Sequence, residues 1–94
     1  MKATKIRMKP GCGSSNSLLE IDEIHLTGSS HLLREGFYKK AVVHDYLKSY
    51  PGSIQVNIYP FPNCIPATSA NGEKYVRSTP NGTEHDNLLR LPRV

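Results

Sequence analysis

The 94-residue sequence has only two cysteines, no long apolar run and no apolar segment after its amino-terminal lysines. A bilayer-spanning helix needs about 20 consecutive apolar residues, and no stretch approaches that length. A secretory signal needs an apolar segment directly after its basic residues, and none follows here. We therefore expect a cytoplasmic protein that does not enter a membrane.

Metal-binding and nucleophilic side chains are sparse as well. The soft ligands are Cys12, Cys64 and four histidines, and no pair of them has zinc-finger spacing. A Cys12–Cys64 disulfide would add about 4 kcal/mol in the chain-entropy model, but the missing export signal favours free thiols. Cys64 stands among prolines, with no helix start nearby to lower its pKa. We expect no metal site, no cofactor and no catalytic residue.

Size and composition favour one small domain. A chain of 94 residues has room for a single core, and its seven prolines and seven glycines indicate many turns and little helix. We assign residues 1–94 to one domain. Residues 1–3 and the Gly- and Ser-rich residues 10–17 are expected to be flexible.

Alternating apolar and polar residues predict most of the strands. Asn71-Gly72 between two extended runs predicts a β-hairpin, because Asn-Gly tolerates the positive φ of a tight turn. The predicted strands are Thr4–Met8, Leu18–Leu26, Ile54–Tyr59 and the hairpin strands Ile65–Ser69 and Glu73–Ser78. We predict an α+β fold, with a mostly antiparallel sheet of about four or five strands packed against one main helix.

The main helix is predicted from about Gly36 to Tyr50. Its apolar stripe consists of Val43, Tyr46, Leu47 and Tyr50, and Pro51-Gly52 would end it. Ser29 and Ser30 would act as caps if a first helical turn begins at residue 31.

The last residues predict a turn followed by an apolar tail. Pro80-Asn81-Gly82 is a strong turn signal, and Asp86 or Asn87 would cap a short helical turn after it. The Leu-rich tail, consisting of Leu88, Leu89 and Leu91, would then close the core before Pro92.

This ending resembles the small bacterial and phage family catalogued as domain of unknown function 3892. The matching residues are Tyr75, Val76, Arg77, Ser78, Asn81, Gly82, Asn87, Leu88, Leu89, Leu91 and Pro92. Members usually carry a tryptophan near the helix start and a cysteine close to the end, whereas this chain has Phe37 and Tyr38 there and finishes with Val94. It is similar to a divergent member, and the resemblance implies a compact α+β domain without an established activity.

Neither the predicted turn nor the packing of the Leu-rich tail against the core explains two residues of this ending. Tyr75 and Arg77 share one face of the last predicted strand. We predict a ligand site made of Lys74, Tyr75, Arg77, Asn81 and Asn87, although a turn role also explains Asn81. The first functional hypothesis is a small non-enzymatic binding or accessory domain for a protein or a small anionic ligand.

Basic residues suggest a second hypothesis. Twelve Lys and Arg against eight acids give a net charge of +4. A basic surface results if Lys5, Arg7, Lys39 and Lys40 converge, and such a face could hold nucleic acid. This is the minority alternative, because dedicated nucleic-acid modules usually show denser basic clusters interleaved with aromatic residues.

A third hypothesis is a small enzyme. It would require a pocket in which His25, His44 or Cys64 meets a carboxylate. The chain is expected to be a monomer or a homodimer, and the strand Ile54–Tyr59 could pair with a second copy if it lies at a sheet edge.

Overall fold

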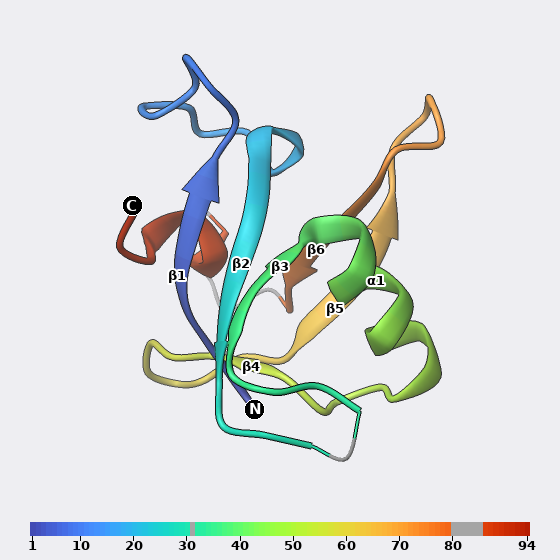
Figure 1. Cartoon of the computed structure of the whole chain (residues 1–94). Helices are drawn as coiled ribbons and strands as arrows, with labels where there is room; N and C mark the ends of the chain where they lie inside the picture. The colour runs from blue at the N-terminus through green and yellow to red at the C-terminus, as the bar shows by residue number, and fades with distance from the viewer. Residues whose placement is uncertain (31, 80–85) are drawn as a thin grey trace.

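The structure, a computed structural model, describes residues 1–30, 32–79 and 86–94. Within these ranges the chain forms strands, one α-helix and two short 3₁₀ helices (Figure 1). In chain order they are β1 (Lys2–Met8), η1 (Leu18–Glu20), β2 (Ile21–Thr27), β3 (Gly36–Lys39), α1 (Lys40–Ser49), β4 (Gln55–Val56), β5 (Cys64–Thr68), β6 (Lys74–Ser78) and η2 (Asn87–Arg90). The predicted α+β class is confirmed.

β1 lies inside a four-stranded sheet of order β3-β2-β1-β4. β2 is antiparallel to both β1 and β3, while the short β4 runs parallel to β1. Beyond β4, the carboxyl-terminal residues pair with the same edge of β1. The Ile6 amide donates to the Pro92 carbonyl at 2.9 Å, and the Val94 amide donates to the Ile6 carbonyl at 3.1 Å. The first strand therefore has partners at both edges, one of them from the far end of the sequence.

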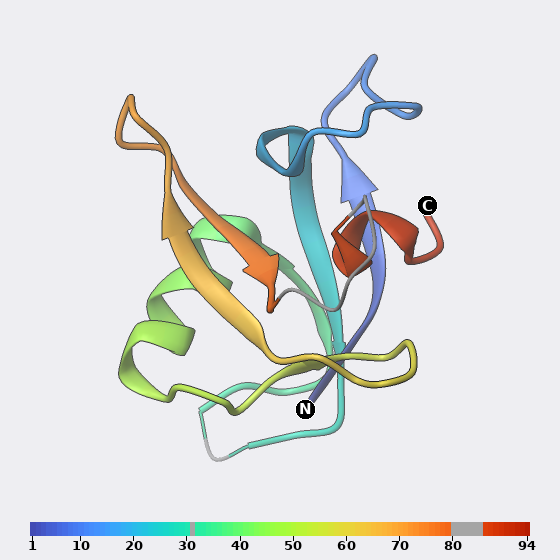
Figure 2. The ribbon, with the colours of Figure 1, turned by 180° about the vertical axis from the view of Figure 1, so that it is seen from behind.

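β5 and β6 form the predicted hairpin. Its register pairs Ala67 with Tyr75 and Thr68 with Lys74, and Gly72 at the turn has a φ of 83°. Glycine adopts this φ without steric cost. The hairpin and η2 lie on one side of the sheet, behind it in Figure 1 and in front of it in Figure 2. α1 contacts both hairpin strands as well as β2 and β3. The other side of the sheet faces solvent.

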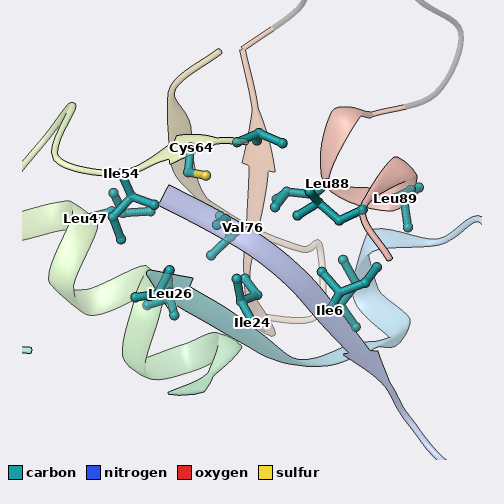
Figure 3. Packing of buried hydrophobic residues seen from close by; sticks show 14 of the residues in the cluster. Ile6, Ile24, Leu26, Leu47, Ile54, Cys64, Val76, Leu88 and Leu89 are labelled. Carbon is teal, nitrogen blue, oxygen red and sulfur yellow. The ribbon is translucent and has the colours of Figure 1, made fainter. Parts of the chain in front are cut away.

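The core fills the space between the sheet, α1, the hairpin and η2. Strand alternation turns Ile6 of β1 and Ile24 and Leu26 of β2 inward, and each is at most 1% exposed. Figure 3 shows these side chains converging with Val76 of β6 and Leu47 of α1.

The Leu-rich tail closes this core as predicted. Leu88, Leu89 and Leu91 are buried. Asp86, and not Asn87, caps η2, because its Oδ1 accepts a hydrogen bond from the Leu88 amide at 2.9 Å. The turn predicted at Pro80-Asn81-Gly82 lies outside the described residues.

The predicted helix begins too early. Residues 36–39 form β3, which is held by pairing with β2, so that Phe37 lies opposite His25. This long-range pairing overrides the local helical period, and α1 begins only at Lys40. Tyr50, assigned to the buried stripe, is the residue after α1 and is 39% exposed. Within the described ranges, no helix has the length and apolar content needed to cross a bilayer.

Three other local predictions need correction. The strand predicted over Ile54–Tyr59 is only Gln55–Val56, because the Phe61 amide bonds to the Ile58 carbonyl and turns the chain away from β1. The first part of the strand predicted over Leu18–Leu26 is the 3₁₀ helix η1. Ser30 Oγ accepts hydrogen bonds from the Leu32 and Leu33 amides, but the described residues 32–35 form no helix.

The segments expected to be flexible make defined contacts. The Met1 amino group donates to the Ser53 carbonyl at 3.0 Å. In the loop of residues 10–17, the Arg93 guanidinium donates to the Gly13 carbonyl at 2.9 Å. The mobility of these segments stays a prediction.

Candidate functional site

The predicted ligand site on β6 is only partly assembled. Tyr75 and Arg77 lie on the face of β6 opposite the buried Val76, as expected, and both are half-buried. Lys74 Nζ instead pairs with Asp45 Oδ1 of α1 at 2.9 Å. The lysine therefore links the hairpin to the helix and does not share a face with Tyr75 and Arg77.

The two asparagines of that site do not extend it. Asn81 lies outside the described residues. Asn87 is 1% exposed. Its backbone amide donates to Ser78 Oγ at 3.3 Å, and its side-chain Oδ1 accepts a hydrogen bond from Arg90 at 3.2 Å. These contacts give Asn87 a structural role between η2 and β6.

The predicted basic residues divide into two groups. Lys5, Arg7 and Lys39 lie on the solvent-facing side of β1, β2 and β3, which we call the outer sheet face. The Lys40 side chain is only 12% exposed and is bound by the Glu73 carboxylate and the Leu19 carbonyl. Lys40 therefore ties α1 to the hairpin and to η1 and does not contribute to the surface.

A basic row runs along β1 on the outer sheet face, and we define it as Lys2, Lys5 and Arg7. A bulge between Ala3 and Lys5 allows two consecutive residues, Thr4 and Lys5, to lie on this face. At about 3.3 Å per residue, the row extends over about 16 Å. Among the described residues, no carboxylate pairs with Lys2 or Lys5.

Aromatic and polar side chains support one end of the row. The Arg7 guanidinium lies 4.1 Å from the centroid of the Phe37 ring and donates to Glu23 at 2.5 Å. His25 contacts the same ring edge-on, with centroids 4.8 Å apart, and its Nδ1 shares a hydrogen bond with Thr4 Oγ1 at 2.9 Å. Arg7 is therefore held in one orientation, which lowers the entropy cost of binding an anion there.

An ion pair also holds Lys39, the last of the four predicted basic residues. Its Nζ contacts Asp22 Oδ2 at 3.0 Å at the β3 edge of the outer sheet face. Neither this pair nor the Arg7–Glu23 pair adds net charge to the face, so its positive character comes from Lys2 and Lys5 of the basic row.

Of the groups named for the enzyme hypothesis, His44 meets a carboxylate. His44 Nδ1 lies 3.0 Å from Asp45 Oδ1, but the imidazole is buried and Asp45 also binds Lys74. Hydrogen bonds from Lys74 and His44 lower the pKa of Asp45. Cys64 is 1% exposed, and burial raises the pKa of its thiol to about 12. A thiol with that pKa stays protonated near neutral pH and is a poor nucleophile.

Cys12 lies in a polar cluster at the far end of β1. Its thiol donates to Glu20 Oε2 at 2.8 Å, and Ser15 donates to the other oxygen of the same carboxylate. The hydrogen bond to Glu20 raises the pKa of Cys12, so this thiol is also less nucleophilic than a free one. Both cysteines are free, and the described residues contain no group of three or more His, Cys, Asp or Glu side chains arranged to hold a metal ion.

The sequence reasoning missed several residues of this face. The sequence pattern places Phe37 in the helix, and its position beside Arg7 follows only from the pairing of β2 with β3. The sequence suggests His25 only as a candidate catalytic group. A usable signal existed in β1, where Lys2, Lys5 and Arg7 recur within seven residues of one strand.

Comparison with known proteins identifies a family. A family model described as "Protein of unknown function (DUF3892)" matches residues 3–92. The resemblance noted in the sequence is thereby confirmed over nearly the whole chain. No curated protein and no solved structure matches it.

Proposed function

We propose that this chain, which belongs to the DUF3892 family of proteins of unknown function, is a non-enzymatic binding domain for an anionic ligand. The observation that carries the proposal is the basic row on the outer sheet face, where Lys2 and Lys5 have no acidic partner among the described residues. Elsewhere on the chain, Lys9, Lys39, Lys40 and Lys74 are each paired with a carboxylate.

The physical basis is the difference between neutralised and unneutralised charge. A lysine in an ion pair must give up that partner to bind a new anion, so its net gain is small. Lys2 and Lys5 carry no such cost. Arg7 is paired with Glu23 and adds no net charge, but its guanidinium is fixed by Glu23 and Phe37, and its remaining N–H groups can donate to phosphate or carboxylate oxygens.

A charge reversal on the row tests the proposal. The probe is inorganic polyphosphate, titrated at low salt into ¹⁵N-labelled protein while backbone amide shifts are followed. Lys5→Glu converts an attraction of about 1 kcal/mol in water into a repulsion of similar size, so affinity should fall by about 30-fold. The largest shifts in the wild type should lie on β1.

The matched control is Lys48→Glu. Lys48 is exposed on α1 and has no acidic partner among the described residues, so this variant makes the same change in net charge away from the row. It should keep most of the affinity. Equal losses in the two variants would mean that polyphosphate responds only to net charge, and would overturn the proposal.

The cellular setting completes the proposal. Both cysteines are free thiols, which is usual in the reducing cytoplasm and supports a cytoplasmic protein. With β4 reduced to two residues, a homodimer through that strand has little edge to use, so we favour a monomer as the binding unit.

A further inference from the structure

The loop of residues 57–62 carries two exposed aromatic rings, and we call it the aromatic loop. Tyr59 is 81% exposed and Phe61 is 44% exposed. Their ring centroids lie 6.0 Å apart, with the ring planes at 82°. Large apolar rings normally gain free energy from burial, so two adjacent exposed rings indicate a surface that another molecule covers.

The backbone holds this loop in one conformation. The Phe61 amide donates to the Ile58 carbonyl at 2.7 Å, and the Val56 amide donates to the Pro62 carbonyl at 2.9 Å. Phe61 has a φ of 61°, which is unfavourable for an aromatic residue and persists only where surrounding contacts impose it. The rings are therefore presented by an ordered loop, and binding does not have to pay for ordering it.

The aromatic loop is continuous with the basic row. The Asn57 amide donates to the Ala3 carbonyl at 2.9 Å, which fixes the loop against the edge of β1. Lys2 Nζ lies 4.7 Å from the centroid of the Phe61 ring. Figure 1 shows the loop beside the amino-terminal end of β1, on the side away from β2. One surface therefore combines cations in a line with aromatic rings at its end.

We propose that this surface binds single-stranded nucleic acid, with phosphates along the basic row and a base stacked on Tyr59. The inference rests on the proposed function and names its ligand class. Proteins that bind single strands combine a basic track with aromatic rings, because every base has a face that can stack. A duplex would not use the rings in this way, since its bases are already stacked on one another.

The experiment separates the charge contribution from the base contribution. Fluorescence anisotropy compares labelled oligo-dT and oligo-rU with an abasic oligonucleotide of the same length and charge. The wild type should bind the base-containing strands more tightly than the abasic strand. Tyr59→Ala should weaken binding of oligo-dT by about 5- to 150-fold, the range measured for one stacked base, and leave abasic binding unchanged.

Two controls define what the ring does. Tyr59→Phe keeps the ring and should keep the preference for bases. Tyr50→Ala removes an exposed tyrosine that lies after α1, away from the aromatic loop, and should not change either affinity. A thermal melt of each variant verifies that it is folded, as expected for surface substitutions.

The outcomes distinguish the two proposals. Equal affinity of the wild type for oligo-dT and the abasic strand, or an unchanged oligo-dT affinity in Tyr59→Ala, would overturn stacking while leaving anion binding intact. That result would assign the aromatic loop to a protein partner. Failure of the abasic strand and of polyphosphate to bind at low salt would overturn the proposed function itself.

Discussion

Truncation of Leu88 to alanine tests whether the carboxyl-terminal tail is part of the cooperative core. Leu88 is 0% exposed, and Figure 3 places it between the ribbons of β6 and β1. Removing three buried carbon groups costs about 2.4 kcal/mol in transfer free energy at about 0.8 kcal/mol each. The cavity left behind raises the expected loss to about 3 to 4 kcal/mol.

This loss is large compared with the stability of a chain of this size. At about 0.05 to 0.15 kcal/mol per residue, the free energy of unfolding should be about 5 to 14 kcal/mol. Urea denaturation followed by circular dichroism should therefore show a clearly lowered midpoint with an unchanged slope. Leu32→Ala provides the matched control, because Leu32 is 55% exposed and the same change there should cost less than about 0.5 kcal/mol. A loss below about 1 kcal/mol for Leu88→Ala would refute the view that the tail closes the core.

Three further predictions concern ionisation, thiol chemistry and capping. Hydrogen bonds from Lys40 and Lys9 lower the pKa of Glu73 below 4.5. The wild type should therefore be more stable than Glu73→Gln by a constant amount above about pH 5, and this difference should be lost as the pH falls through the lowered pKa. Urea denaturation of both proteins at several pH values measures the difference. A thiol reagent at pH 8 should modify Cys12 slowly in the native protein and Cys64 only after unfolding. Fast native labelling of Cys64 would contradict its burial. Asp86→Ala removes the hydrogen bonds that its carboxylate accepts from the Leu88 and Ser78 backbone amides, and it should cost about 1 to 2 kcal/mol in the same urea denaturation experiment. No change would show that neither the cap of η2 nor the link to β6 contributes to stability.

The arginine and tyrosine of the hairpin offer a direct comparison with the basic row. Tyr75 and Arg77 are half-buried on β6, away from the outer sheet face. Arg77→Ala should leave the salt dependence of oligonucleotide binding unchanged. Lys5→Ala should reduce the slope of log K against log salt by about 0.7. The opposite result would move the site to the hairpin.

Local signals in the sequence were sufficient for several elements. The hairpin follows from Asn71-Gly72, because Gly72 supplies the positive φ that the short loop between Ser69 and Glu73 requires. The inward side of β1 follows from the alternation that ends in Ile6 and Met8. In each case, residues that are adjacent in the sequence determine the local structure.

Elements decided by distant contacts were not predictable in the same way. β3 exists because it pairs with β2, although its sequence continues the period of α1. Nothing in the local sequence distinguishes Lys40 and Lys74 from Lys5, yet carboxylates on other elements neutralise both of them. No periodic pattern of apolar and polar residues marks the aromatic loop. The exposure of Tyr59 depends instead on where the chain turns after β4.

The pairing of Ile6 with Pro92 and Val94 has a consequence for how the chain folds. Contacts between residues this far apart in sequence require a long loop to close, which makes them slow to form. We expect this edge of β1 to stay open until late in folding, when an unpaired strand edge is prone to pair with another chain. Positive side chains on such a strand repel a second copy of it. Lys2, Lys5 and Arg7 would then protect the unfinished protein from self-association before they ever meet a ligand.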